Sequence, residues 1–329
     1  MKTLIIPSVS YEHDLNKKLE IMSKMNISMV RINFGRGSIE HNLESVYFIH
    51  KNYPHMHIAL DLPGNKNRIN SLIGEDIKIK KKEKFIITIC NESEHQKPSN
   101  KLKISLTHWN YRIVEGDIIT FGDRDLIAKV INVNKEFITL LALKDGKIKS
   151  KSGLIIKEKY EANSTFSDIE RYIARETLCY VNEVFLSFAD TVERINLCRT
   201  VYPNQKIIAK IETPYALNNI DLISSVSDGL MLARGDLQNY YNINEINNEI
   251  LILLYNKAKE SNKHLYVATN YFKTILNNNF LSEKERIILH KALSYSPKYI
   301  LLNETCYSDE WLKVCRVAQA EINKCFSEL

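Results

Sequence analysis

The chain has 329 residues, of which 44% are hydrophobic and 26% charged, an ordinary composition for a globular protein with one large core or two smaller ones. No apolar run approaches the roughly 20 residues of a membrane-spanning helix, and the apolar stretch in MKTLIIPSVS is too short for a signal peptide. The six cysteines form no CxxC pair and no zinc-like spacing. We therefore expect a cytoplasmic protein with reduced thiols, no membrane partner and no zinc site.

The net charge of +6 is concentrated in one segment. Residues 69–157 hold 17 Lys and Arg against 11 Asp and Glu, a balance of +6, which leaves 28 residues of each sign elsewhere. The stretch IKIKKKEKF contributes most, and its lysines suit either a protected strand edge or a face that meets an anion. No nucleic-acid-binding motif accompanies the charge, so nucleic acid is not an expected partner.

Short β-rich runs alternate with amphipathic helical patterns along most of the chain. Eight runs are strand-like: residues 3–8, 29–34, 57–62, 183–188, 206–211, 229–234, 264–269 and 299–304. Between them, patterns such as HDLNKKLEIMSKMN place apolar residues at spacings of three and four, which is typical of helices. Nearly continuous apolar strands that each precede a helix predict an α/β protein with a parallel (β/α)8 TIM barrel.

The segment after the third strand is too long for a barrel loop. It has strand-like runs of its own, KFIITIC, DIITF, LIAKVINV and FITLLAL, which are separated by turn residues such as EGD and KDG. We therefore assign residues 69–157 to a small inserted domain resembling a β-barrel. Residues 1–68 and 158–329 would form the barrel.

Polar residues end seven of the eight predicted strands. They are Arg31, Asn33, Asp61, Ser187, Lys210, Glu212, Arg234, Asp236, Thr269 and Glu304. Active sites of such barrels form where the C-terminal strand ends meet. Solvation of loops explains a single polar residue such as Ser187 or Glu304 equally well, but it explains the convergence of Lys210, Glu212 and Asp236 poorly.

The residue types at these strand ends indicate a metal and phosphate site. Glu212 and Asp236 offer the hard oxygen ligands that Mg²⁺ prefers, and Mg²⁺ leaves positions for substrate oxygens. Lys210 would neutralise a transferring phosphoryl group or an enolate oxygen, and Arg31 could fork onto phosphate. No glycine-rich P-loop is present, so a nucleotide would be held differently.

Five stretches follow one another along the chain, with a β insert after the third strand: SMVRINFGRG, ALDLPGNKNR, KIIAKIETP, SDGLMLARGDL and VATNYF. Together they resemble the pyruvate kinase family. The resemblance runs over nearly the whole chain, which ends at INKCFSEL after the eighth helix, whereas family members usually carry a further C-terminal domain. It therefore implies a protein without that regulatory domain and without control by sugar phosphates, in which any homo-oligomer forms through barrel surfaces.

The resemblance implies roles for individual residues. Lys210 would stabilise the phosphoryl group and the enolate, while Glu212 and Asp236 would hold Mg²⁺ or Mn²⁺. The backbone of Ala233, Arg234, Gly235 and Asp236 would receive the substrate carboxylate, with Ser187 also on the substrate side. Thr269 would lie near the face where the enol carbon is protonated.

The nucleotide and phosphate side follows from the same resemblance. Arg31 would contact phosphate, and the other residues expected there are Asn33, Arg36, Asp61, Lys66 and Arg68. The inserted domain would act as a lid, and its positive charge suits closure over anions.

Departures from the family pattern gather on this nucleotide side. The family's Asn-Phe-Ser-His-Gly is NFGRG here, and Asp-Thr-Lys-Gly-Pro-Glu-Ile-Arg is DLPGNKNR. Gly35 and Leu62 remove two oxygen ligands of the family's monovalent-cation site, so potassium is not expected to be required. Lys66 could provide the missing positive charge. Arg36 and Pro63 replace a histidine and a lysine, and Leu302 replaces a serine.

Three functions remain open from the sequence. The first is a Mg²⁺-dependent, potassium-independent phosphotransferase that acts between phosphoenolpyruvate, or a related enolisable 2-oxo acid, and a nucleotide or other small acceptor. The second is a metal-dependent lyase or aldolase that acts on a 2-oxo acid with the same carboxylate cradle. The third is a catalytically silent binding or regulatory protein.

Overall fold

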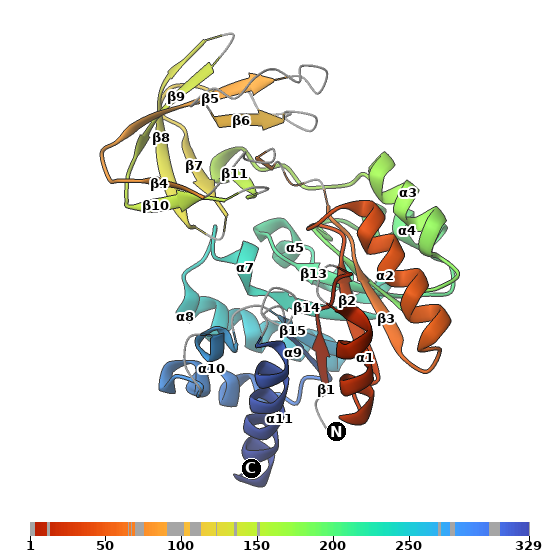
Figure 1. Ribbon diagram of the computed structural model, residues 1–329. Helices are drawn as coiled ribbons and strands as arrows, with labels where there is room; N and C mark the ends of the chain where they lie inside the picture. The colour runs from red at the N-terminus through yellow and green to blue at the C-terminus, as the bar shows by residue number, and fades with distance from the viewer. Residues whose placement is uncertain are drawn as a thin grey trace. The chain divides into compact units, whose positions relative to one another are not determined.

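The computed structural model describes most of the chain, in two compact units (Figure 1). The described residues are 4–11, 14–64, 66, 68–69, 76–90, 102–105, 113–122, 124–134, 137–149, 152–268, 271–276, 280–302 and 310–328. The first unit comprises Met1–Gly64, Ala162–Leu237 and Tyr241–Leu329, and the second comprises Asn65–Glu161 and Gln238–Tyr240.

The first unit is built around an eight-stranded parallel sheet. Its strands are β1 (Leu4–Pro7), β2 (Met29–Asn33), β3 (His57–Asp61), β12 (Glu183–Leu186), β13 (Lys206–Ile211), β14 (Gly229–Ala233), β15 (His264–Ala268) and β16 (Tyr299–Leu302). They pair in the order β1-β16-β15-β14-β13-β12-β3-β2. A parallel bridge between Ser8 and Arg31 brings β1 against β2, so the sheet is a nearly closed barrel. The TIM-barrel prediction is confirmed.

Helices follow the strands and cover the outside of the barrel (Figure 1). They are α1 (Leu15–Lys24), α2 (Ile39–Asn52), α3 (Asp168–Thr177), α4 (Val192–Val201), α5 (Pro214–Asn218), α6 (Ile220–Val226), α7 (Arg234–Leu237), α8 (Ile243–Glu245), the π-helical η2 (Ile246–Ile250), α9 (Leu251–Glu260), the 3₁₀ turn η3 (Lys273–Leu276), α10 (Glu283–Ser294) and α11 (Trp311–Glu328). None of the described helices is long and apolar enough to cross a bilayer.

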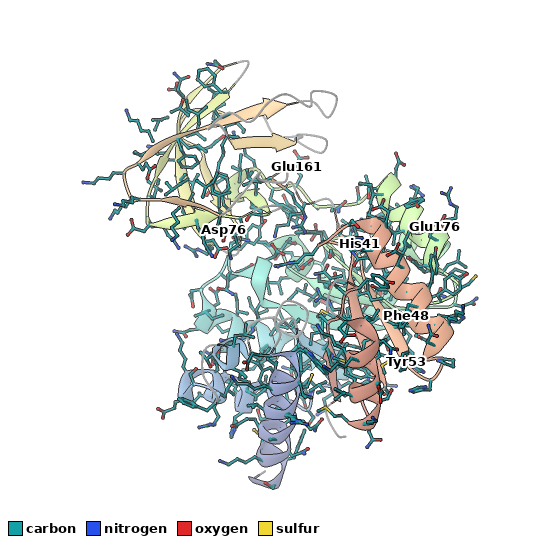
Figure 2. The ribbon with its side chains drawn as sticks, viewed as in Figure 1. His41, Phe48, Tyr53, Asp76, Glu161 and Glu176 are labelled. Carbon is teal, nitrogen blue, oxygen red and sulfur yellow. The ribbon has the colours of Figure 1, made fainter. Side chains whose placement is uncertain are left out.

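Side-chain caps fix where several of these helices begin. Ser167 and Glu170 form a reciprocal capping box at the start of α3, and the Thr191 hydroxyl accepts the Arg194 N–H at the start of α4. Helices α2 and α3 lie side by side, and the Tyr47 hydroxyl donates to the Glu176 carbonyl oxygen at 3.3 Å. Figure 2 labels His41 and Phe48 on α2, Tyr53 directly after its end, and Glu176 near the end of α3.

Strand alternation divides the side chains of the barrel into an outer set, packed under the helices, and an inner set. The inner set contains an apolar cluster in which Phe185, Ile208 and Tyr266 are fully buried. Residues two positions before or after these on the same strands also point into the barrel. Polar side chains at those positions lie on both sides of the apolar middle layer. The layer at the C-terminal ends of the strands is the candidate site.

The second unit consists of β structure. A six-stranded sheet has the order β11-β7-β8-β9-β5-β6, with β5 (Lys84–Cys90), β6 (Leu102–Ser105), β7 (Ile118–Phe121), β8 (Leu126–Val133), β9 (Phe137–Ala142) and β11 (Leu154–Ile156). A two-stranded sheet joins β4 (Ile77–Ile79) to β10 (Gly146–Ile148), and the turn η1 (Lys157–Lys159) follows β11. The four strand-like runs noted in this part of the sequence coincide with β5, β7, β8 and β9.

The second unit has its own apolar core, which contains Phe121, Leu126 and Leu140. Its main segment runs from residue 65 to residue 161, against predicted limits of 69 and 157, and residues 238–240 also belong to it. Lys66 and Arg68, which were predicted to end the first barrel segment, belong to this unit. Its role as a lid stays a prediction.

Candidate active site

Four neighbouring strands bring charged and polar side chains together inside the C-terminal mouth of the barrel. Arg31 lies on β2, Asp61 ends β3, Ser187 follows β12, and Lys210 lies on β13. The strands pair in register, with Asn33 beside Asp61 and Lys210 beside Met231. Because parallel strands end on one side of the sheet, a separation of up to 149 positions along the chain becomes direct contact.

Asp61 is the junction of this cluster, and it is only 2% exposed. Arg31 donates to its Oδ2 through Nε at 2.9 Å and Nη2 at 2.8 Å, and Lys210 Nζ lies 3.0 Å from its Oδ1. Burial opposes the charge of Asp61, but Lys210 and Arg31 outweigh burial and hold its pKa below the ordinary value. Asp61 is therefore an anion held between two cations.

The forked edge of Arg31 points at Asp61, and its Nη1 donates to Ser8 Oγ at 2.8 Å. The guanidinium orientation is thus set from two sides. Ser8 is a site neighbour that the sequence analysis missed, although it closes the first predicted strand run and sits at the same barrel end. Counting every polar residue at a strand end would have found it.

Lys210 makes three polar contacts. Its Nζ lies 3.0 Å from Asp61 Oδ1, 3.1 Å from Glu212 Oε1 and 2.8 Å from Ser187 Oγ. Burial disfavours the ammonium, but the two carboxylates outweigh burial and raise the pKa of Lys210 above its ordinary value. The side chain is therefore a fixed positive charge in a water-poor environment, which is the condition that strengthens electrostatic stabilisation of a reacting anion.

Glu212 is 3% exposed and uses both of its carboxylate oxygens. Oε1 faces Lys210, and Oε2 accepts the backbone N–H of Phe188 at 2.8 Å. Burial, helped by the negative charge of Asp236 and opposed by Lys210, raises the pKa of Glu212 to about 7. The interaction with Asp236 means that two carboxylates share this end of the barrel.

Two carboxylates with mutual repulsion fit a Mg²⁺ ion, which binds proteins through one or two carboxylates and keeps waters or substrate oxygens on its other positions. The described residues contain no group of three or more His, Cys, Asp or Glu side chains that could hold a metal. A pair of carboxylates such as Glu212 and Asp236 suits an open Mg²⁺ site, and their role as metal ligands stays a prediction.

The segment from Ala233 to Asp236 changes from strand to helix. Strand β14 ends at Ala233 and α7 begins at Arg234, so Asp236 lies in the first turn of a short helix. Amide groups of a first turn have no acceptor within the helix, which suits the predicted carboxylate cradle. The cradle itself stays a prediction.

The Arg234 side chain extends away from this backbone. It is 1% exposed, its guanidinium lies 3.6 Å from the centroid of the Tyr271 ring, and Nη1 donates to Asn247 Oδ1 at 3.0 Å. No local sequence pattern indicated these contacts, because Asn247 lies in η2 and Tyr271 lies between β15 and η3. They hold the Arg234 side chain at the start of α7.

The remaining predicted residues make local contacts, belong to the second unit or lie outside the described residues. Asn33 Oδ1 accepts the Gly35 N–H at 2.9 Å and shapes the turn after β2, and Arg36 is exposed. Lys66 and Arg68 belong to the second unit, where Arg68 bridges Gly153. Thr269, like Glu304, lies outside the described residues, so its predicted role is untested.

A nearly closed parallel barrel with charged side chains at the C-terminal ends of its strands defines the (β/α)8-barrel class. Residues 1–287 match the family model described as pyruvate kinase, barrel domain. The chain belongs to this family, which confirms the resemblance seen in its motifs.

Curated relatives agree with this assignment at low identity. The chain is 26% identical to the pyruvate kinase of Thermotoga maritima, over 96% of this chain and 69% of that protein. It is 24% identical to the enzyme of Thermococcus litoralis and 25% identical to that of Aeropyrum pernix, over 72% and 85% of this chain. The chain spans 51% and 61% of the lengths of those two proteins.

Proposed function

We propose that the protein is a Mg²⁺-dependent phosphotransferase of pyruvate kinase type, which moves a phosphoryl group between phosphoenolpyruvate, or a related enolisable 2-oxo acid, and a nucleotide or other small acceptor without needing potassium. One observation carries the proposal: the Lys210 side chain, 12% exposed, is held by Asp61, Ser187 and Glu212 at the mouth of the barrel. A protein that only binds a ligand does not need a largely buried cation held by two carboxylates.

In the direction toward the nucleotide, the bond between phosphorus and the enol oxygen breaks, and a bond forms from phosphorus to an oxygen of the acceptor. The enolate that leaves takes up one proton at its terminal carbon and becomes the 2-oxo acid. Negative charge therefore grows on the bridging oxygen as the phosphoryl group departs. The Lys210 ammonium, held in place before the reaction, would stabilise that charge.

Glu212 and Asp236 would hold the metal ion, which would supply Lewis-acid stabilisation of the phosphoryl and enolate oxygens. The raised pKa of Glu212 fits this assignment, since a divalent cation relieves the repulsion from Asp236 and favours the ionised carboxylate. The first-turn backbone of α7 would receive the substrate carboxylate.

Potassium independence is supported by the state of Asp61. The family's monovalent cation would need oxygen ligands at this end of the barrel, where the chain has Gly35 and Leu62. The Asp61 carboxylate is already bound by Arg31 and by Lys210. Arg31 and Lys210 thus already compensate charge that a bound potassium ion would otherwise meet.

The proposal is tested by ³¹P NMR of the purified protein with phosphoenolpyruvate, Mg²⁺ and ADP or another nucleoside diphosphate, with KCl or with tetramethylammonium chloride at equal ionic strength. We expect phosphoryl transfer at rates that agree within about twofold in the two salts, and loss of transfer in Lys210→Ala. Transfer that requires KCl would overturn potassium independence. If no phosphoryl group leaves phosphoenolpyruvate under any of these conditions, transfer from this donor to a nucleoside diphosphate is rejected, and metal-dependent cleavage of 2-oxo acids is the next activity to assay.

A further inference from the structure

Arg194 is a fully buried cation that lies on α4, outside the barrel, and among the described residues it contacts no predicted site side chain directly. Its side chain and that of its ion-pair partner Glu170 are both 0% exposed, and Arg194 Nη2 lies 2.7 Å from Glu170 Oε1. Taking an ion pair fully out of water is unfavourable unless further hydrogen bonds satisfy its polar atoms. The remaining N–H donors of Arg194 must therefore have acceptors inside the protein.

Those donors converge on backbone carbonyls at the edge of the candidate site. Arg194 Nε and Nη2 donate to the Ser187 carbonyl oxygen at 3.0 and 2.8 Å, and Nη1 donates to the Thr165 carbonyl oxygen. A planar fork that grips one carbonyl oxygen with two N–H groups fixes the direction of that carbonyl.

The Ser187 carbonyl and the Phe188 N–H are the two ends of a single peptide unit. The unit is planar and trans, so its C=O and N–H point in opposite directions. Its C=O accepts from Arg194, and its N–H donates to Glu212 Oε2 at 2.8 Å. One peptide dipole thus lies between a buried cation outside the barrel and a buried carboxylate inside it, aligned with both charges.

The backbone at this peptide needs outside support. Phe188 has a φ of 51°, in the left-handed region that residues with a β-carbon rarely adopt. Such a conformation persists only when the surroundings hold it. The hydrogen bonds from Arg194 to the Ser187 carbonyl and from the Phe188 N–H to Glu212 supply that support.

Ser187 links the same peptide to the catalytic lysine. Its hydroxyl lies 2.8 Å from Lys210 Nζ, and Lys210 in turn contacts Glu212 Oε1. A rotation of the 187–188 peptide would therefore remove the Phe188 N–H from Glu212. It would at the same time disturb the contact of the Ser187 hydroxyl with Lys210. The groups proposed to hold the metal and to stabilise the enolate depend on one backbone orientation.

We propose that Arg194 is a positioning residue for the site: it holds the Ser187–Phe188 peptide so that the Phe188 N–H binds Glu212 in its metal-binding orientation. The inference rests on the proposed function for the metal assignment of Glu212, but the peptide orientation is testable without turnover. Removing a hydrogen-bond partner of a metal ligand typically weakens metal binding by about 10- to 100-fold.

The test compares Arg194→Lys with Glu170→Gln. Lysine keeps the buried positive charge but cannot fork onto the Ser187 carbonyl, whereas Glu170→Gln removes the ion pair and leaves the grip of Arg194 on that carbonyl. Binding of Mn²⁺ is measured by electron paramagnetic resonance. The Phe188 amide is followed by NMR with selective ¹⁵N-phenylalanine labelling. The chain has 11 phenylalanines, and the signal of Phe188 is identified as the one lost in Phe188→Leu.

We expect Arg194→Lys to weaken Mn²⁺ binding by about tenfold or more and to shift the Phe188 amide signal upfield with faster hydrogen exchange. Glu170→Gln should lower thermal stability at least as much, yet leave Mn²⁺ affinity within about twofold and the Phe188 signal in place. An unchanged Phe188 signal and unchanged Mn²⁺ affinity in folded Arg194→Lys would overturn the inference, whatever the turnover.

The two proposals fail in distinguishable ways. A wild-type protein that transfers no phosphoryl group, but whose Phe188 amide and Mn²⁺ affinity respond to Arg194→Lys and not to Glu170→Gln, rejects the phosphotransferase assignment and supports the positioning role. Normal transfer by both wild type and Arg194→Lys, with the Phe188 signal unmoved, supports the phosphotransferase assignment and rejects the positioning role.

Discussion

Lys210 and Asp61, 149 positions apart in the chain, meet at 3.0 Å between Nζ and Oδ1 inside the mouth of the barrel. Each is almost buried, and each shifts the pKa of the other so as to favour its charged form. The pair is therefore a permanent dipole at the site rather than a proton-transfer couple. Chemistry at this position should depend on the fixed charge of Lys210 and not on its titration.

Replacing Lys210 with Met is expected to lower phosphoryl transfer by about 10²- to 10³-fold or more, because a preorganised charge at the departing oxygen is lost. It should also lower the free energy of unfolding by about 3 kcal/mol, since Asp61 and Glu212 lose a buried partner. Lys206→Met is the matched control. Lys206 is the first residue of the same strand and lies on the same face as Lys210, but at the N-terminal end of the barrel. Transfer by Lys206→Met should stay within about twofold, and equal losses in the two variants would remove the special role of Lys210.

Lys66 is predicted to replace the charge of the potassium ion. Its side chain crosses Gly153, where an added β-carbon would lie 2.0 Å from Lys66 Cε. If the prediction holds, Lys66→Ala should slow transfer in tetramethylammonium chloride and recover part of the rate in KCl. Lys129→Ala, which removes an exposed lysine from β8 of the same unit, should show no salt-specific effect. A Lys66→Ala protein as indifferent to KCl as wild type would contradict the prediction.

Much of the barrel was predictable because its strands are buried on both faces, which produces nearly continuous apolar runs with a recognisable length. The pairing of Lys210 and Glu212 on one face also follows from strand alternation alone. Local sequence does not specify which distant residue neutralises which charge. Asp61 at the junction of two cations is a consequence of strand order around the barrel.

Two features of the site had no readable pattern in the sequence. Phe188 takes a left-handed backbone conformation without the glycine that usually indicates one. Arg194 and Glu170 look like surface charges in the sequence. Burial of such a pair depends on two helices and a loop packing together, which no local pattern reveals. Both are tertiary effects that override local preference.

A second polar layer, at the N-terminal ends of the strands, predicts a pH effect on stability. Glu183 is 3% exposed and accepts the Tyr266 hydroxyl at 2.9 Å. Burial raises its pKa above the ordinary 4.5, although the Tyr266 hydrogen bond and the charge of Lys206 oppose the shift. As the pH rises from about 4.5 through the raised pKa, the native state holds a proton that the unfolded state has lost, so this group's contribution to stability falls.

Glu183→Gln removes that titration, so its stability relative to wild type should improve steadily with pH across this window. The measurement is urea unfolding of both proteins at a series of pH values. Glu20→Gln is a control of opposite sign at lower pH, because Lys24 holds the pKa of Glu20 below its ordinary value and the effect of Glu20 on stability is confined to pH values below about 4.5. A stability difference between Glu183→Gln and wild type that does not change with pH would show that Glu183 titrates normally.

Gly64 is predicted to be indispensable beside the 187–188 peptide. Its φ is +66°, and an added β-carbon would lie 2.7 Å from Phe188 Cδ2 and 3.0 Å from Ser187 Cβ. Gly64→Ala therefore combines backbone strain of about 1 kcal/mol with a steric clash, and should lower the free energy of unfolding by roughly 2–4 kcal/mol in total.

Gly37→Ala separates the two contributions to the Gly64→Ala effect. Gly37 belongs to the same unit and has a φ of +70°, but the nearest atom to an added β-carbon is 3.8 Å away, so only backbone strain applies. In denaturant unfolding we expect Gly64→Ala to be the more destabilised of the two variants. Its Phe188 amide signal should also move, because a displaced ring carries its own backbone away from Glu212. Equal destabilisation with an unmoved Phe188 signal would mean that the ring of Phe188 yields easily and that Gly64 is needed only for its backbone conformation.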